Sequence, residues 1–444
     1  MTTTTIDTSA TSLLRFATAG SVDDGKSTLV GRLLHDSKSV LADQLEAVET
    51  ASRNRGQQAP DLALLTDGLR AEREQGITID VAYRYFATPR RRFILADTPG
   101  HVQYTRNMVT GASTAELTII LVDARNGVVE QTRRHAAVAA LLRVPHIVLA
   151  VNKMDLVDHA EPVFARIAEE FTAYATQLGL PEVTAIPISA LNGDNVVEPS
   201  AHMDWYGGPT VLEHLETVPV GTDPSDAPAR FPVQYVIRPQ TAAHPDYRGY
   251  AGQIASGVLR VGDPVTVLPS GLTSTITGID ALGRAMDVAW APQSVTLLLA
   301  DDVDISRGDL ITPTAAAPTT TQDVEATICH LHERPLKVGD RVLLKHTTRT
   351  VKAIVKALPY RIDLTHDLAH QDLPEELGVN DIGTVVLRIS EPLPLDPYAV
   401  SRQTGSFLLI DPADGTTLTA GMAGEAFARN ASAEGAAHGD GWDF

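Results

Sequence analysis

The stretch Gly20-Ser-Val-Asp-Asp-Gly25-Lys26-Ser27-Thr28 decides the fold of this chain. It fits the pattern G-x-x-x-x-G-K-[S/T], a phosphate-binding loop whose backbone N–H groups surround a polyphosphate. In such a loop Lys26 reaches the β- and γ-phosphate oxygens, and the Ser27 hydroxyl binds Mg²⁺. The motif must join a strand to a helix. An apolar run precedes it at Leu13–Ala19, and helical spacing follows it in Leu29, Val30, Leu33 and Leu34.

The composition is that of a soluble, multidomain protein. The chain has 444 residues, of which 43% are hydrophobic and 20% charged, enough for two to four domains. A single cysteine, Cys329, excludes an internal disulfide framework and fits a reducing compartment, so we expect a cytoplasmic location. No apolar run is long enough to span a membrane, and the Thr-rich N-terminus does not resemble a secretory signal.

Strand-like and helical stretches alternate from residue 13 to about 217, which is typical of a mostly parallel α/β sheet. A polar signature ends each strand candidate: GSVDDGKST, DTPGH, DAR, NKMD and SAL. Ligands of open α/β sheets bind at the carboxyl ends of the strands, so five signatures at one edge predict a binding site there. The strand candidates are Leu13–Ala19, Arg92–Ala96, Leu117–Val122, His146–Val151 and the weaker Thr184–Ile188.

The rest of the chain changes to short β-type runs, one of them Gly252–Leu259, separated by Gly, Asp and Pro turns. We predict a multidomain chain in which the α/β P-loop domain is followed by two small antiparallel β-barrel domains. The expected division is a disordered tail at 1–12, the P-loop domain at 13–217, barrels at 230–312 and 322–425, and a disordered tail at 430–444. A proline-rich linker at 218–229 and a spacer at 313–321 separate these parts.

The segment Asp97-Thr-Pro-Gly100-His101 follows a strand about seventy residues after the phosphate loop. At this strand end a carboxylate can hold a Mg²⁺-bound water, and the Gly100 N–H can meet the γ-phosphate. His101 stands where a residue that orients the attacking water belongs, although a lone histidine is usually structural. Thr78, between the phosphate loop and Asp97, is the second hydroxyl that we place on Mg²⁺.

Asn152-Lys153-Met-Asp155 indicates guanine specificity. The Asp155 carboxylate only accepts hydrogen bonds, and guanine presents N1–H and the 2-amino group as adjacent donors. Adenine has no such pair, so the carboxylate would be left unpaired against ATP. A helix N-cap would explain Asp155 but not the Asn-Lys pair before it. We expect the loop Ser189-Ala190-Leu191 to support the same base through a backbone N–H.

Together these residues predict a Mg²⁺-dependent GTPase. The catalytic candidates are Lys26, Asp97 and His101, and the Mg²⁺ ligands are Ser27 and Thr78. The expected phosphate-binding residues are Gly20, Ser21, Val22, Asp23, Asp24, Gly25, Lys26, Ser27, Thr28, Asp97, Thr98, Pro99, Gly100 and His101. Arg90-Arg-Arg92 is interpreted as a solvated strand entry rather than a binding patch.

These motifs, followed by two β-barrels, resemble the translation-factor class of GTPases, whose best-known member is elongation factor Tu. Within that class the chain looks like the large, GTP-hydrolysing subunit of bacterial sulfate adenylyltransferases. The similarity is carried by GSVDDGKSTLVGRLLHDSK (20–38), DLALLTDGLRAEREQGITIDVAYRYF (61–86), DTPGHVQYTRNMVTGAS (97–113), and FPVQYVIRP with DYRGYAG (231–239, 246–252). Asp23-Asp24 stands where translational members usually carry a histidine, and Val102 where relatives often have an acidic residue.

The resemblance implies a heterodimer or higher heteromer with a small catalytic subunit. That subunit makes adenosine 5′-phosphosulfate and pyrophosphate from ATP and sulfate, and GTP hydrolysis on the present chain drives the reaction. No second phosphate loop and no H-x-G-H-type adenylyl-transfer signature occurs in this sequence. The alternative is a translational GTPase that delivers a tRNA or another partner. A formal net charge of −19 argues against it, since nucleic-acid binding needs a basic surface.

Overall fold

The structure is a computed structural model of the 444-residue chain. It describes residues 12–37, 48, 52, 62–65, 81–98, 105–180, 182–220, 226–239, 246–363 and 369–424. Most of both expected tails lies outside these ranges, and so do Thr78, Pro99, Gly100 and His101. Within the described ranges, no helix combines the length and the apolar character that a membrane crossing requires.

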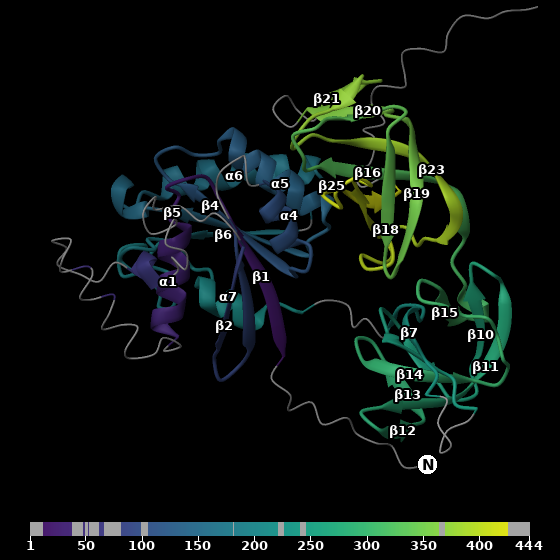
Figure 1. Ribbon diagram of the computed structural model, residues 1–444. Coiled ribbons are helices and arrows are strands. Elements are labelled where there is room, and N and C mark those ends of the chain that lie inside the picture. The colour runs from purple at the N-terminus through teal and green to yellow at the C-terminus, as the bar shows by residue number, and fades with distance from the viewer. Residues whose placement is uncertain are drawn as a thin grey trace, which may run out of the picture.

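The N-terminal part is built on a six-stranded sheet in the order β2-β3-β1-β4-β5-β6 (Figure 1). All neighbours are parallel except the edge pair β2–β3, which is antiparallel. The prediction of a mostly parallel sheet is therefore confirmed. Its strands are β1 (Leu13–Ala19), β2 (Ala82–Ala87), β3 (Arg92–Asp97), β4 (Leu117–Asp123), β5 (His146–Asn152) and β6 (Val183–Pro187).

Helices cover both faces of this sheet, because alternate residues of each inner strand point to opposite sides. One hydrophobic cluster joins the sheet to α4, α5 and α6, and another joins it to α1 and α7. Every residue of β4 is buried, which explains its mostly apolar sequence. The helices are α1 (Lys26–Asp36), α4 (Thr105–Ala112), α5 (Glu130–Leu141), α6 (Glu161–Gln177) and α7 (Val211–Thr217), with short 3₁₀ turns η1 (Leu62–Leu65) and η3 (Met154–Val157).

The next part forms a closed antiparallel barrel, here called the first barrel. Its ring runs β10-β15-β7-β8-β14-β11 and closes through β10–β11 pairing, with β12 added to β11. The strands are β7 (Phe231–Ile237), β8 (Gly249–Gln253), β9 (Val258–Arg260), β10 (Pro264–Leu268), β11 (Leu272–Ala281), β12 (Arg284–Met286), β13 (Val288–Trp290), β14 (Ser294–Leu299) and β15 (Leu310–Pro313). Strands β9 and β13 pair separately, and a turn, η5 (Thr314–Ala316), follows β15.

The second barrel has the ring β16-β25-β24-β18-β19-β23, closed by β16–β23 pairing and extended by β20 and β21. Both predicted barrels are therefore confirmed. The strands are β16 (Thr320–His330), β17 (Leu336–Lys337), β18 (Arg341–His346), β19 (Arg349–Ala357), β20 (Tyr360–Asp363), β21 (Ala369–Asp372), β22 (Glu376–Leu377), β23 (Ile382–Pro394), β24 (Ser406–Ile410) and β25 (Thr417–Ala423).

Two details of the barrels differ from the sequence-based expectation. The run Gly252–Leu259 was expected to be one strand, but it divides between β8 and β9. Gly257 lies between them with a φ of 75°, and a Cβ there would come within 2.3 Å of the Ala229 backbone. The spacer 313–321 is also more structured than expected, because β15, η5 and β16 occupy most of it.

The second barrel packs against α4 and α5 of the N-terminal part (Figure 1). The Tyr398 hydroxyl donates to the Leu142 carbonyl, just past α5, at 3.1 Å. Arg402 donates to the carbonyls of Ser113 at 2.7 Å and Ala115 at 3.0 Å, just past the end of α4. A cation near the last carbonyls of a helix is favourable, since those groups have no partner within the helix.

A buried ion pair joins the two barrels. Arg230, at the start of the first barrel, donates through Nε and Nη2 to the two carboxylate oxygens of Asp396, each at 2.9 Å. The Thr404 hydroxyl donates to the same carboxylate at 2.6 Å. Although burial raises the pKa of the Asp396 carboxyl, the hydrogen bonds from Arg230 and Thr404 lower it overall. The pair is therefore charged at neutral pH and fully hydrogen-bonded, as a buried ion pair requires.

Changing Arg230→Ala should lower the free energy of unfolding by about 3–5 kcal/mol, because it leaves a buried carboxylate without its cation. The matched control is Arg388→Ala, which removes an exposed pair with Asp323 (2.7 Å) in the second barrel and should cost about 1 kcal/mol or less. Urea unfolding followed by circular dichroism compares them. Equal shifts for the two variants would show that the Arg230–Asp396 pair does not hold the barrels together.

Candidate nucleotide-binding site

The phosphate loop lies where the sequence predicts it, between β1 and α1. Gly25 is the N-cap of α1 and has a φ of 92°, in the left-handed region that favours glycine. A Cβ at Gly25 would lie 2.4 Å from Asn152 Nδ2. Glycine is therefore required at this position for two reasons, the left-handed backbone conformation and the lack of space for a Cβ. The N-terminus of α1 presents backbone N–H groups and the positive end of the helix dipole to an anion.

Lys26 is buried within this loop, with 8% of its surface exposed. Its Nζ donates to the carbonyls of Gly20 at 2.8 Å and Ser21 at 2.7 Å, which holds the ammonium across the loop. Burial lowers the pKa of the Lys26 ammonium, and the nearby carboxylates of Asp24 and Asp97 oppose that shift. Ser21 Oγ is buried and makes no hydrogen bond with the described part of the chain. A phosphate oxygen would satisfy both groups.

Asp23 and Asp24 shape the loop in different ways. Asp23 has a φ of 64°, a left-handed conformation at the tip of the loop. The buried Asp24 carboxylate accepts from the Ser21 N–H at 2.6 Å and so folds the loop back on itself. Burial raises the pKa of the Asp24 carboxyl, and the Ser21 hydrogen bond acts against this. Val22 is exposed beside them.

Asp97 and Thr98 lie at the carboxyl end of β3, next to the phosphate loop. The Thr18 hydroxyl donates to Asp97 Oδ1 at 3.0 Å, and the Thr98 hydroxyl donates to the Thr18 carbonyl. All three side chains are buried. Ser27 and Thr28 lie in the first turn of α1 and are partly exposed. The predicted roles of Thr78, Pro99, Gly100 and His101 stay predictions, since these residues lie outside the described ranges.

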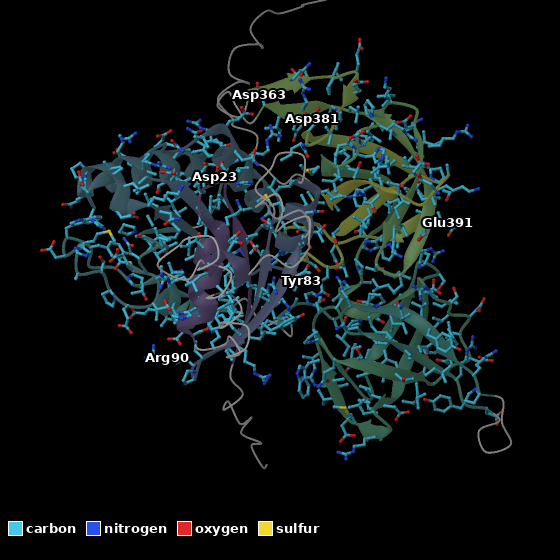
Figure 2. All side chains as sticks on the ribbon, turned by 60° about the vertical axis from the view of Figure 1, so that its left-hand side comes forward. Asp23, Tyr83, Arg90, Asp363, Asp381 and Glu391 are labelled. Atoms are coloured by element: carbon cyan, nitrogen blue, oxygen red, sulfur yellow. The ribbon has the colours of Figure 1, made fainter. Side chains whose placement is uncertain are left out.

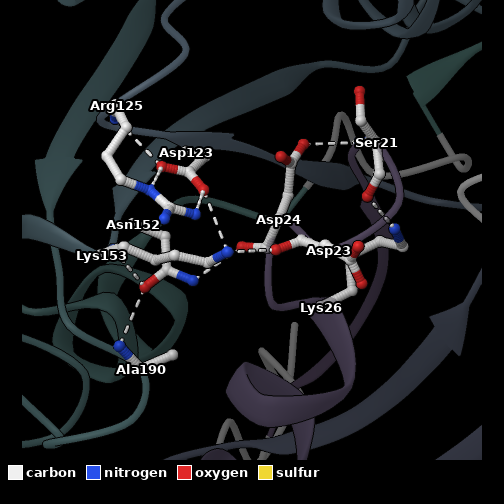
Figure 3. Close-up of polar contacts among 9 residues, drawn as sticks. All are labelled: Ser21, Asp23, Asp24, Lys26, Asp123, Arg125, Asn152, Lys153 and Ala190. Atoms are coloured by element: carbon white, nitrogen blue, oxygen red, sulfur yellow. Dashed lines mark hydrogen bonds and ion pairs between the residues drawn. The ribbon is translucent and has the colours of Figure 1, made fainter. Parts of the chain in front are cut away.

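Asn152, the last residue of β5, joins the two ends of the site (Figure 3). Its Nδ2 donates to the Asp24 carbonyl in the phosphate loop at 2.7 Å. Its Oδ1 accepts from the Ala190 N–H at 2.9 Å and from the Lys153 N–H at 2.8 Å. One buried amide therefore fixes the phosphate loop against the loop 189–191, which was predicted to support the base.

Asp155 lies in η3, beside that loop. Its Oδ1 accepts from the Ser189 hydroxyl at 2.6 Å. This bond positions the carboxylate, whose oxygens together can accept about four hydrogen bonds and so can still meet a base. Leu191 is exposed at the rim of the site. The structure thus brings together all six residues predicted to bind guanine: Asn152, Lys153, Asp155, Ser189, Ala190 and Leu191.

Lys153 makes contacts that the sequence analysis did not foresee. Its Nζ donates to the Asp23 carbonyl and forms an ion pair with Asp123 Oδ2 at 3.0 Å. Asp123, the last residue of β4, is also held by Arg125 (Figure 3). In the sequence, the DAR signature at the end of β4 was the only indication that Asp123 and Arg125 lie at the site.

Arg32 was also missed. It lies on α1, and its Nε donates to the Ala190 carbonyl at 3.3 Å while Nη2 donates to the Leu191 carbonyl. The helix that begins at the phosphate loop therefore also holds the loop at the base end. Arg32 and Ala190 are far apart in the sequence, so no local pattern could have revealed the contact.

The basic run 90–92 lies at the turn between β2 and β3, at the opposite end of the sheet from Asp23 (Figure 2). Arg90 is exposed, as expected for a solvated strand entry. Arg91 was expected to be solvated as well, which is wrong. It is buried and donates to the Leu215 and Val218 carbonyls at 2.9 and 2.7 Å, at the end of α7. Burial lowers the pKa of the Arg91 guanidinium.

The donors in the loop suit a magnesium–nucleotide complex better than a metal ion bound by protein side chains alone. No three His, Cys, Asp or Glu side chains of the described ranges are grouped so that they could hold a metal ion. The buried Ser21 hydroxyl, the Lys26 ammonium and the start of α1 are donors suited to phosphate oxygens. Ser27 supplies a hydroxyl at the same helix turn.

Family comparisons agree with this geometry. The Elongation factor Tu GTP binding domain family matches residues 11–220. The family described as GTP-eEF1A C-terminal domain-like matches residues 323–423. The first match covers the sheet, its helices and every residue of the site. The chain therefore carries a GTPase domain of the elongation factor Tu type, and such a domain binds GTP.

Full-length relatives are similar over most of the chain. The bifunctional enzyme CysN/CysC of Mycobacterium tuberculosis is 56% identical over 93% of this chain and 67% of its own length. Sulfate adenylyltransferase subunit 1 of Bacteroides fragilis is 49% identical over 92% of this chain and 85% of its own length. The subunit 1 of Aeromonas hydrophila is 50% identical over 94% and 87%, respectively.

Changing Asp155→Asn should weaken GTP binding by roughly 10²- to 10⁴-fold and favour xanthosine triphosphate, because the amide can donate to the 2-oxo group of xanthine. The matched control is Asp158→Asn, at an exposed position that caps the same turn η3. Equilibrium titration with both nucleotides measures the preference. An unchanged preference for GTP would remove Asp155 from the base site.

Proposed function

Because the chain belongs to the family of sulfate adenylyltransferase subunit 1, we propose that it hydrolyses GTP to drive sulfate activation on a separate small subunit. That subunit would form adenosine 5′-phosphosulfate and pyrophosphate from ATP and sulfate. The observation that carries the proposal is a guanine-type nucleotide site on a chain about half identical to several proteins of that name. The words "subunit 1" in those names also support a partner chain.

The phosphate end of the site acts through position and charge. The N-terminus of α1 and the Lys26 ammonium would bind the β- and γ-phosphates, where negative charge develops as the terminal phosphate leaves. Mg²⁺ would neutralise the charge of the same oxygens, with Ser27 and Thr78 as its protein ligands and Asp97 behind it. Asp97 is buried and already fixed by Thr18, which favours a role through a water molecule rather than direct coordination.

The base end of the site selects the nucleotide. Asp155, held by Ser189, faces a base whose donors must match its carboxylate. Guanine offers two such donors, and adenine would leave the carboxylate unpaired, so GTP is favoured over ATP. The preference for GTP supports a model in which the partner subunit uses ATP and this chain uses GTP.

Hydrolysis needs a group that orients the attacking water, and we assign this role to His101. The segment that carries His101 leads directly into α4, which begins at Thr105. Arg402 of the second barrel donates hydrogen bonds to carbonyls just past the other end of α4. The second barrel therefore contacts the region of the helix that follows the His101 segment in the chain.

Reconstitution tests the coupling. The chain is purified with and without the small subunit encoded by the same organism, and GTP hydrolysis is followed by phosphate release. ATP and sulfate together should stimulate hydrolysis only when the small subunit is present. Stimulation by ribosomes or aminoacyl-tRNA, with no response to ATP and sulfate, would contradict the proposal.

Changing His101→Ala should slow GTP turnover by at least about tenfold and leave nucleotide affinity nearly unchanged, because its contact forms only in the transition state. His332→Ala, on the second barrel, controls for the loss of a histidine. Single-turnover hydrolysis and a separate GDP titration give the two quantities. A large loss of affinity with normal turnover would refute the assignment.

A further inference from the structure

A second carboxylate, besides Asp155, lies at the base end of the site and has no role in the account above. Asp123 ends β4 and is the register partner of Asn152 on β5. It is 2% exposed. Its Oδ1 accepts from the backbone N–H and the Nε of Arg125, both at 3.0 Å. Its Oδ2 accepts from Arg125 Nη2 at 2.6 Å and from Lys153 Nζ at 3.0 Å. These four bonds fill the acceptor positions of the carboxylate.

Lys153 links the Asp123 carboxylate to the phosphate loop. The ammonium that contacts Asp123 also donates to the Asp23 carbonyl. The Lys153 backbone is in the left-handed region, with a φ of 63°, and its N–H is held by Asn152 Oδ1. A continuous path of polar contacts therefore runs from Arg125 at the surface through Asp123 and Lys153 to the loop (Figure 3).

We propose that Arg125 and Asp123 are positioning residues for the guanine nucleotide, which hold the Lys153 ammonium against the phosphate loop. The inference rests on GTP binding at this site. Arg125 is suited to the task because a planar guanidinium grips a carboxylate with two parallel bonds, which fixes the carboxylate's rotation as well as its charge. Without the Arg125 guanidinium, the Asp123 carboxylate would keep only the Lys153 ammonium. It would then draw that ammonium away from the Asp23 carbonyl.

Charge and geometry exclude a different role for Arg125. Although burial raises the pKa of the Asp123 carboxyl, the hydrogen bonds from Arg125 and Lys153 lower it well below its usual range, so the carboxylate is charged at neutral pH. The guanidinium is committed to that carboxylate, next to the guanine-binding segment. It therefore holds Asp123 and is not available to stabilise charge on the phosphate that is transferred.

Changing Arg125→Ala should raise the Kd for GDP and the KM for GTP by the same factor, about three- to tenfold, and change kcat by less than about twofold. Inosine triphosphate should lose affinity by that factor too, because the contact to the base edge is untouched. Stopped-flow release of a fluorescent GDP and steady-state hydrolysis measure these values. Wild-type binding of GDP is recorded first, since its absence would refute GTP binding itself rather than the role of Arg125.

Three further variants separate positioning from a general structural effect. Arg125→Lys should recover part of the affinity, because it restores the charge but not the two-pronged grip. In a Lys153→Ala background, Arg125→Ala should have little additional effect, since the path is already broken. Arg388→Ala, which removes a similarly exposed arginine from an ion pair in the second barrel, should leave nucleotide affinity unchanged.

Two results would overturn the inference. A fall in kcat at unchanged KM would place Arg125 at the phosphate that is transferred. Additive effects of the Arg125 and Lys153 substitutions would show that Arg125 does not act through Lys153.

Discussion

Two hydrogen bonds of the buried Asn152 amide, with the Asp24 carbonyl and the Ala190 N–H, set the distance between the phosphate loop and the loop at the base end. The rest of the site is arranged around this distance. Gly25 must be glycine because the same amide lies against it, and Lys153 follows Asn152 directly. Lys153, through the Asp23 carbonyl, and Arg32 from α1 add separate connections between the two ends. A ligand that spans both ends therefore binds to a site whose two loops are already held at a fixed separation.

The sequence predicted most of the site because its motifs are local. The phosphate loop, the Asn152–Asp155 segment and the loop 189–191 each have a recognisable pattern, and parallel strands bring their ends to one edge. The DAR signature marked Asp123 and Arg125 only as part of a strand end, and Arg32 was missed. The contacts of Asp123 with Lys153 and of Arg32 with the loop 189–191 join elements far apart in the chain, and such contacts leave no periodicity in the sequence. Asp23 and Asp24 were predicted to bind phosphate and were noted as a departure from translational members, and they prove to determine the shape of the loop.

The same reasoning explains what was predicted of the fold. Inner parallel strands such as β4 are buried on both faces and appear as nearly continuous apolar runs. The edge strand β2 was missed because it has no continuous apolar run: Tyr83 and Tyr85 are exposed, and Phe86 is its buried residue. Composition indicated two barrels, but not that Arg230 and Asp396 join them. Nor did it indicate that Arg402 connects the second barrel to the end of α4.

The central claim is that this edge of the sheet binds a guanine nucleotide and rejects adenine through one positioned carboxylate. Calorimetric titration of the unmodified chain with GDP and with ADP, in Mg²⁺ buffer, tests it most directly. The account predicts saturable binding of one GDP per chain and ADP binding weaker by at least about a thousandfold, as expected when a bound base covers an acceptor and leaves it unpaired. Equal affinities for the two nucleotides, or tighter binding of ADP, would contradict it.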